Sequence, residues 1–442
     1  MFAGAYKLNN KREETKKIGL WIAVSLVVGN MIGSGIFLLP ASLAPYGGVS
    51  ILGWLTTTVG ALFTALVFVR LSKSFPKQGG PYRYAYDNFG PLAGFTVSWS
   101  YWVSIWCGNA AISVAATTYL SHFFPVLSNT PAISIGVALS ILWSITLINT
   151  RGVRQAGFFQ LVTTVLKLIP LFFIGIAAFW VFDVSAFEPF NPSDNTLAFS
   201  VNATAALTLW AFLGLESATI PADNVDKPAV TIPRATIIGF SVTAIIYIST
   251  QVAIMSVLPA EQLAQSGAPF AEAAQKIWGD WAGNLVAAGA VISCIGALNG
   301  WILLQGQVPM TAARDNLLPE IFRDTKIPGV SIGALVFSSV LISILVIANF
   351  SEGLVSLFTF AILVSTLGIF MPYLLSILAD IRFTLKQWKT QRDIKNLIIA
   401  ALAFIYCCWA ISGIGTKALL WGMLLILSGL PIYLFTRNKL KN

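Results

Sequence analysis

The sequence of residues 29–40 is GNMIGSGIFLLP. This stretch lies inside the first long apolar run of the chain, which covers residues 18–43. Glycine destabilises the interior of a helix, and a helix that breaks inside a bilayer frees N–H and C=O groups that must find partners other than water. The stretch therefore predicts a first span that is interrupted in mid-membrane, with freed backbone groups directed at a neighbour or a ligand.

A second stretch of this kind lies five spans further along, where residues 209–218 are LWAFLGLESA and Pro221 follows. The two stretches occupy corresponding positions in two possible five-helix halves. Gly-interrupted segments in matching halves are the best sequence pointer to a transport site at the membrane midplane. The alternative is a tight helix crossing, because small residues let membrane helices approach each other closely. The carboxylate of Glu216 inside one stretch favours the site.

The composition predicts an all-α membrane protein. Of the 442 residues, 56% are hydrophobic and only 10% are charged, whereas soluble domains carry about 25% charged residues. A membrane-spanning helix needs about 20 apolar residues, and such runs recur along most of the chain. We predict 12 transmembrane helices, at residues 18–43, 48–70, 92–123, 132–150, 156–182, 199–225, 232–258, 282–312, 331–349, 353–379, 395–413 and 417–436.

The net charge of +9 follows from basic residues in the two termini and in alternate loops. Lysine and arginine concentrate in the cytoplasmic loops of membrane proteins. The basic loops include residues 70–83, 151–154, 227–234, 314–326 and 382–395. The opposite loops carry mainly carboxylates, with Lys276 and Lys417 as their cations. We therefore expect a multi-pass protein with both termini in the cytoplasm.

Six tryptophans lie near predicted span ends, where tryptophan often sits at the membrane–water interface. We expect them to anchor the protein at the two interfaces. They are Trp54, Trp99, Trp180, Trp278, Trp281 and Trp421.

The sequence contains no recognisable enzyme site. It has no nucleotide-phosphate loop and no zinc-ligand spacing, and His122 is its single histidine. The four cysteines, Cys107, Cys294, Cys407 and Cys408, form neither a disulfide framework nor a metal-ligand pattern. We expect no enzymatic activity, no metal, no cofactor and no nucleic-acid partner.

The two glycine-containing stretches, residues 29–40 and 209–218, resemble the corresponding segments of the amino acid–polyamine–organocation superfamily. Within it the chain is most similar to the basic amino acid/polyamine antiporters, and in particular to the arginine/agmatine antiporters. The likeness runs nearly end to end. Further matching residues are Tyr101-Trp102, Gly108-Asn109, Gly300-Trp301 and Met371-Pro372-Tyr373. The combination of Trp210, Glu216, Asn109 and Trp301 is more specific than the glycine motif.

The resemblance implies a LeuT-type fold of two inverted five-helix repeats, often as a homodimer in a bacterial inner membrane. Residues 18–182 would form the first repeat and residues 199–379 the second, with helices 1 and 6 interrupted. Residues 395–436 would add two helices, and residues 1–17 and 437–442 would be cytoplasmic tails.

The resemblance also implies binding roles for individual residues. The interrupted segment at Ser34 and Gly35 would hold a substrate carboxylate, and carbonyls near Trp210 and Leu213 would receive its amino group. Trp210 would also stack on the substrate side chain, while Trp301 and Tyr101 would act as gates. The implied binding set is Asn30, Met31, Ser34, Gly35, Ser104, Ile105, Asn109, Trp210, Leu213, Trp301 and Ser365, with Asn109 at the far end of the substrate. Tyr373 joins Tyr101 in the gating set.

Two ionisable residues inside predicted spans bear on coupling, because intramembrane charges are functional by default. Glu216 could exchange a proton for substrate charge or sense external acidity. The alternative is a protonated, structural glutamate. Lys167 departs from the antiporter pattern and resembles the proton-coupled amino acid transporters of the superfamily, in which an ammonium replaces sodium close to span one. The alternative for Lys167 is a side chain that extends toward the membrane–water interface and has no coupling role.

The sequence therefore leads to a secondary transporter that works by alternating access. The first hypothesis is exchange of a basic amino acid, arginine, for its decarboxylated amine, agmatine. The second is a proton-coupled amino acid importer that uses Lys167. A channel or a non-transporting membrane sensor is a third possibility, which the paired interrupted helices disfavour. The expected partners are a cationic amino acid or amine, protons and membrane lipid.

Overall fold

The computed structural model describes residues 17–439 except residue 78, residue 152 and residues 324–329, 350–353 and 388–392. Residues 1–16 and 440–442, which belong to the two predicted tails, lie outside the described residues. Within the described part the secondary structure is helical, apart from an isolated bridge between Ile18 and Val225. The predicted all-α class is thus confirmed.

The helices that form the body of the molecule follow the predicted spans along the chain. Ten helical segments of the described residues are long and apolar enough to cross a membrane, and two more, Leu197–Ala211 and Ile332–Ala348, are apolar but shorter. The helices are α1 (Leu20–Met31), α2 (Ser34–Leu43), α3 (Val49–Ser74), α5 (Pro91–Leu120), α7 (Pro131–Asn149), α8 (Val153–Val181), α9 (Leu197–Ala211), α10 (Pro228–Val257), α13 (Asp280–Arg314), α14 (Ile332–Asn349), α15 (Leu354–Lys386), α16 (Ile394–Ile411), α17 (Thr416–Leu427) and α18 (Gly429–Lys439).

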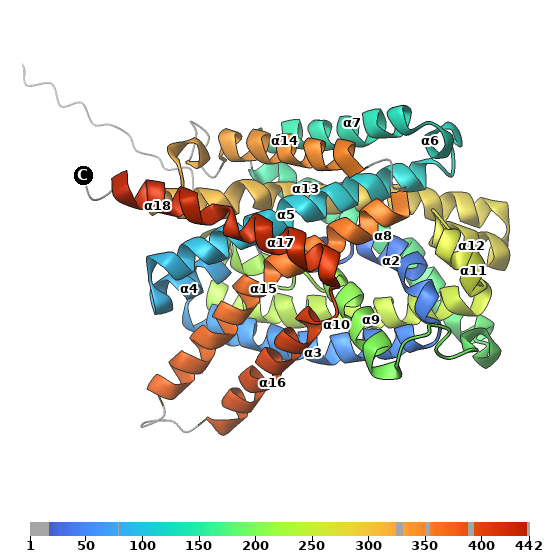
Figure 1. The fold of residues 1–442 in the computed structure, drawn as a ribbon, viewed down its shortest axis with the longest axis horizontal. Coiled ribbons are helices and arrows are strands. Elements are labelled where there is room, and N and C mark those ends of the chain that lie inside the picture. The colour runs from blue at the N-terminus through green and yellow to red at the C-terminus, as the bar shows by residue number, and fades with distance from the viewer. Residues whose placement is uncertain are drawn as a thin grey trace, which may run out of the picture.

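Shorter helices connect these segments at the two ends of the bundle. They are α4 (Pro81–Phe89), α6 (Val126–Asn129), α11 (Ala260–Gln265) and α12 (Pro269–Trp278). Figure 1 shows the long helices side by side, with α7 and α14 along one edge and α3 and α16 along the other. Helix α5 lies in the middle and packs against α13 and α15. Helix α1 packs against α8 and α10, and α9 packs against α3.

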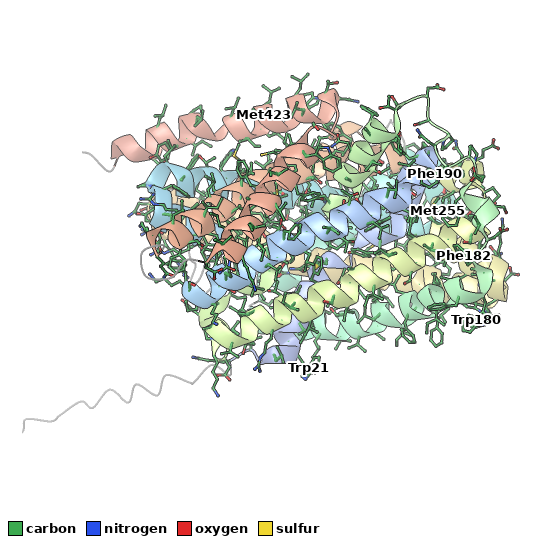
Figure 2. The ribbon with its side chains drawn as sticks, turned by 90° about the horizontal axis from the view of Figure 1, so that it is seen from below. Trp21, Trp180, Phe182, Phe190, Met255 and Met423 are labelled. Carbon is green, nitrogen blue, oxygen red and sulfur yellow. The ribbon has the colours of Figure 1, made fainter. Side chains whose placement is uncertain are left out.

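Large apolar side chains cover the outside of the bundle, as lipid contact requires. Figure 2 shows Trp21, Trp180, Phe182 and Met423 pointing away from the ribbon, and Trp180 is 78% exposed. In a soluble protein an exposed apolar surface of this kind would promote association. Here it is the surface that faces lipid tails.

The prediction of six interfacial tryptophans was wrong for two of them. Trp54 is 1% exposed and packs against the rings of Phe212 and Tyr247. Trp99 is buried, and its indole N–H donates to the Leu425 carbonyl at 3.0 Å. Apolar spans leave no polar face in the sequence, so position along a span does not tell whether a tryptophan faces lipid or protein.

The first span is built from α1 and α2, with Ile32 and Gly33 between them. A Cβ atom on Gly33 would lie 2.8 Å from the Ala297 Cβ of α13. Helix α9 ends at Ala211, and Gly214 beyond it has a φ of +105°. A Cβ atom there would lie 3.0 Å from the Asn30 Cβ. The two glycine-containing stretches therefore meet, so the close crossing and the break in helical structure occur at the same place.

We predict that Gly214→Ala lowers the free energy of unfolding by about 1–3 kcal/mol, because a side chain at this backbone conformation is strained and presses on Asn30. The measurement is the melting temperature of the detergent-purified protein. Gly136→Ala is the matched control, since a Cβ atom at Gly136 meets nothing within 4 Å. Equal melting temperatures for the two variants would contradict the packing described here.

Candidate functional site

A small cavity lies between the two stretches that leave helical structure, and helices α5, α13 and α15 close it. It is lined by Asn30, Met31, Gly33, Ser104, Ile105, Gly108, Ile112, Trp210, Leu213, Trp301 and Ser365. The cavity volume is about 20 Å³, which is room for about one water molecule. The structure therefore represents a closed conformation, in which a larger ligand needs side chains to move.

The N-terminus of α2 supplies hydrogen-bond donors next to this cavity. Its N-cap residue, Gly33, has no side chain to satisfy the first N–H groups of the helix. The Ser34 hydroxyl is fully buried and has no hydrogen-bond partner among the described residues. Free N–H groups and the positive end of a helix dipole attract anions. This end of the site is suited to a carboxylate.

The C-terminus of α1 is satisfied in a different way, by side chains from three neighbouring helices. The last carbonyls of a helix have no partner within it. The Lys167 ammonium of α8 donates to the Gly29 carbonyl at 2.7 Å and also to the Ile32 carbonyl. The Trp301 indole of α13 donates to the Asn30 carbonyl at 3.1 Å.

Tyr247 of α10 completes this set and connects the two breaks. Its hydroxyl lies 2.5 Å from the Met31 carbonyl and 2.9 Å from the Ala211 carbonyl at the end of α9. The ring is fully buried against Trp54 and Phe212. Sequence reasoning missed Tyr247, because a tyrosine inside an apolar span carries no signal of its partner.

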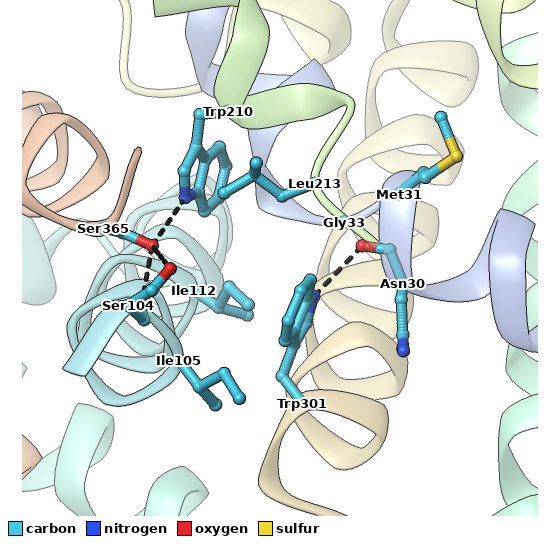
Figure 3. Close-up of a pocket in the computed structure, with 11 residues that line it drawn as sticks. Asn30, Met31, Gly33, Ser104, Ile105, Ile112, Trp210, Leu213, Trp301 and Ser365 are labelled. Atoms are coloured by element: carbon cyan, nitrogen blue, oxygen red, sulfur yellow. Dashed lines mark hydrogen bonds between the residues drawn. The ribbon is translucent and has the colours of Figure 1, made fainter. Parts of the chain in front are cut away.

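Two tryptophans form the aromatic part of the cavity wall (Figure 3). The Trp210 indole donates to the Ser365 hydroxyl at 3.3 Å, and that hydroxyl donates to the Ser104 carbonyl at 2.7 Å. A Cβ atom on Gly35 would lie 2.7 Å from the Trp210 ring. The ring therefore rests directly on the backbone of the first turn of α2, which explains the glycine there.

The predicted gating residues Tyr101, Glu216 and Tyr373 meet in a buried cluster beside the end of α9. The Tyr101 hydroxyl donates to Glu216 Oε1 at 2.5 Å, and the Tyr373 hydroxyl donates to Oε2 at 2.7 Å. The Gly214 N–H also donates to Oε2, at 3.2 Å. One carboxylate thus joins α5 and α15 to the segment that follows α9. None of the three side chains lines the cavity.

Lys167 lies apart from this cluster. Its side chain is fully buried and points at the carbonyls of α1, so the interfacial alternative for it is wrong. No ion pair joins Lys167 to Glu216 in the part of the chain that the structure describes. The protein thus holds a cation and a carboxylate at two separate places around the breaks.

Most of the predicted binding residues line the cavity, and three do not. Ser34 and Gly35 lie behind its wall, at the start of α2, and Asn109 bonds Gln305 through its side-chain N–H at 2.7 Å. Gly33, Gly108 and Ile112 line the cavity although they were absent from the predicted set. Each of these is a direct chain neighbour or a helical-turn neighbour of a predicted residue.

No group of three His, Cys, Asp or Glu side chains within the described ranges is arranged to hold a metal ion. The cavity is lined by hydroxyl, amide, indole and apolar side chains and by glycine backbone.

Comparisons with known proteins agree on one family. A family model described as amino acid permease matches residues 18–431. The cadaverine/lysine antiporter of Escherichia coli (strain K12) is 35% identical over 405 residues, which are 90% of this chain and 90% of that protein. The arginine/ornithine antiporter of Pseudomonas aeruginosa is 31% identical over 446 residues, covering 97% of this chain and 92% of the relative.

A solved structure shares the fold at low sequence identity. A Na⁺-coupled sialic acid symporter in a substrate-bound outward-open state matches with a TM-score of 0.59 and 13% identity, covering 93% of each chain. At this identity the likeness concerns the fold alone, and it supports the expected LeuT-like fold.

We predict that Tyr247→Phe lowers the free energy of unfolding by about 1–3 kcal/mol, because it removes the buried hydroxyl that joins the ends of α1 and α9. The Met31 carbonyl keeps the Gly33 N–H at 3.0 Å, whereas the Ala211 carbonyl loses its side-chain donor. The melting temperature in detergent measures the change. Tyr46→Phe is the control, since the Tyr46 hydroxyl has no hydrogen bond to any described residue and its ring is half-buried. A melting temperature equal to that of the wild type for Tyr247→Phe would mean that the hydroxyl does not hold the two breaks together.

Proposed function

This chain belongs to the amino acid permease family, and on that premise we propose that it exchanges a basic amino acid for an amine or a second basic amino acid across a bacterial inner membrane. The family and the relatives are transporters, so the chain is a membrane transporter and not an enzyme. The relatives are named for cadaverine and lysine, for arginine and ornithine, and for putrescine. Arginine and agmatine remain one candidate pair within our proposal.

One observation carries the proposal most strongly. The uncapped start of α2 and the unpartnered Ser34 hydroxyl are buried beside a cavity with two indole rings in its wall. A carboxylate would fit the donors at Ser34 and Gly35, while a cationic side chain would fit the face of Trp210. A cation over an indole ring contributes about 0.5–2 kcal/mol. Acceptors for an amino group would be carbonyls near Trp210 and Leu213.

The rest of the site would surround the substrate side chain. Ser104, Ile105 and Ser365 lie on one side of the cavity, and Asn30, Met31 and Trp301 line it near the end of α1. In our proposal Asn109 meets the far end of the substrate. Because the cavity volume is about 20 Å³, the Trp301 indole would have to release the Asn30 carbonyl and swing away before a substrate enters. This movement would be one gate.

The Tyr101–Glu216–Tyr373 cluster would form a second gate. Its hydrogen bonds join three segments that alternating access must move relative to one another. We further propose 12 spans in two inverted repeats, both termini in the cytoplasm, and a homodimer in contact with lipid. The basic loops of the sequence support this orientation.

A second candidate function is proton-coupled import of an amino acid, which the contacts of Lys167 favour. Its ammonium binds two carbonyls at the break after α1, and among the described residues it forms no ion pair with a carboxylate. Gain or loss of a proton there would change how firmly the end of α1 is held. Lys167 would then couple proton movement to the opening of the site.

Vesicles that contain the purified protein distinguish the two functions. For exchange, uptake of labelled arginine or lysine should rise at least about tenfold when the vesicles are loaded with a basic amino acid or its amine, because an antiporter needs a counter-substrate. Empty vesicles with a pH gradient provide the other arm. If labelled substrate is taken up strongly into these empty vesicles, and Lys167→Ala abolishes that uptake, the result would contradict exchange and support proton-coupled import.

We predict that Glu216→Gln flattens the dependence of exchange rate on external pH, because the amide cannot gain or lose a proton at the centre of the cluster. The measurement is the initial exchange rate from pH 4 to pH 8, about the range in which carboxyl and imidazole groups titrate. Glu261→Gln removes a carboxylate from the exposed surface and is the control. If both variants keep the wild-type pH profile, Glu216 has no role in sensing acidity.

A further inference from the structure

A chain of buried hydrogen bonds leads away from Asn109 through three other helices. The Asn109 side-chain N–H donates to Gln305 Oε1 of α13 at 2.7 Å. Gln305 Nε2 lies 3.3 Å from the Ser339 hydroxyl and 3.4 Å from the Leu335 carbonyl, both on α14. The Ser339 and Thr146 hydroxyls are 2.8 Å apart. All four polar side chains, of Asn109, Gln305, Ser339 and Thr146, are at most 2% exposed.

The orientation of the Gln305 amide is set by the Leu335 carbonyl of α14, which lies 3.4 Å from Nε2 and can only accept. The Ser339 hydroxyl lies 3.3 Å from the same Nε2 and can accept from it. Ser339 also bonds the Thr146 hydroxyl, and either of these two hydroxyls can donate. The NH₂ group of Gln305 therefore faces α14. Its oxygen faces Asn109.

This direction determines what Asn109 presents to its surroundings. Amide O and N atoms are assigned from their hydrogen-bond partners, and here Gln305 Oε1 requires the NH₂ group of Asn109. The Asn109 oxygen is left over, is buried, and accepts no hydrogen bond from any described residue. A buried acceptor without a donor favours any ligand that supplies one.

Asn109 lies next to the residues that line the candidate site. Ile105 and Ile112 line the cavity, and they lie one turn before and one turn after Asn109 on the same face of α5. Gln305 lies one turn beyond the cavity-lining Trp301 on α13. None of the residues that line the cavity is charged.

We propose that Gln305 is a positioning residue that sets substrate class, by holding the Asn109 amide so that an acceptor meets the far end of the ligand. This inference rests on the proposed function and adds a specificity determinant to it. The site then selects ligands that end in an ammonium or guanidinium group, without a carboxylate at that end. Ligands of the same length with an apolar end leave the oxygen unpaired and bind more weakly.

A contact between the Asn109 oxygen and the far cationic group would be shared by a basic amino acid and its amine. Decarboxylation removes the carboxylate of a basic amino acid and leaves its far cationic group unchanged. A basic amino acid and its amine would therefore use Asn109 equally, although only the amino acid has a carboxylate for the start of α2. A change at Gln305 should weaken lysine and cadaverine by similar factors.

The test is calorimetric binding of L-lysine, cadaverine and L-2-aminoheptanoate, in which a methyl group replaces the side-chain ammonium of lysine. Gln305→Met removes both polar atoms at nearly constant volume and frees the Asn109 amide to rotate. The preference for lysine over 2-aminoheptanoate should fall about tenfold or more, as expected for a lost hydrogen bond to a charged group. Ser113→Ala is the control, because the Ser113 hydroxyl bonds only the backbone carbonyl of Asn109, and it should keep the wild-type preference.

A double-mutant cycle separates positioning from a general loss of shape. Asn109→Asp presents oxygen in either orientation, so adding Gln305→Met to it should change the preference less than about threefold. A tenfold loss in both backgrounds would overturn the proposal.

Gln305→Glu gives a test that does not depend on the methionine variant folding. Its carboxylate still accepts from Asn109, so the lysine preference should be kept or increased, and a tenfold fall would also overturn the inference.

The outcomes distinguish this inference from the proposed function. A wild-type protein that binds neither lysine nor cadaverine, nor any other basic amino acid or amine, would refute both. A wild-type protein that prefers lysine over 2-aminoheptanoate, together with a Gln305→Met variant of unchanged preference, would refute only the role of Gln305.

Discussion

The structure depends on how the backbone groups freed at two breaks are satisfied away from water. At the end of α1 the carbonyls receive hydrogen bonds from Lys167, Trp301 and Tyr247. At the start of α2 the N–H groups have no side-chain cap, and the Ser34 hydroxyl has no partner. In a bilayer each backbone group without a hydrogen-bond partner raises the free energy of the folded protein by several kcal/mol. The asymmetry leaves one end of the break satisfied within the protein and the other end with free donors, which we propose bind an anionic ligand.

The same hydrogen bonds connect the site to the helices around it. Trp301 both lines the cavity and donates to α1, so moving its ring to admit a ligand also releases a carbonyl. Tyr247 joins the end of α1 to the end of α9 through one hydroxyl. Glu216 joins the segment after α9 to α5 and α15. In the proposed function, binding in the cavity would be linked to rearrangement of the bundle through these polar contacts.

Sequence reasoning found the components whose chemistry is unusual inside a membrane. Glu216, Lys167 and the glycine-rich stretches stand out because charges and helix breakers are rare in apolar spans. It did not find Tyr247, and it placed Trp54 and Trp99 at the interface although both are buried. Aromatic residues are ordinary on both the lipid-facing and the protein-facing side of a span. Only their contacts distinguish the two.

By itself the sequence determined the helical membrane class, because this follows from the length of the apolar runs. Local backbone preference also pointed to the two glycine-containing stretches at which α1 and α9 end. The tertiary structure decided which side chains hydrogen-bond the backbone groups freed at each break. It also decided that Glu216 and Lys167 lie at separate places. It also decided the orientation of the Asn109 amide, through Gln305 of α13 and the Leu335 carbonyl of α14. Partners such as Asn109 and Gln305 are 196 residues apart in the chain, and no local pattern specifies which distant side chain completes a hydrogen bond.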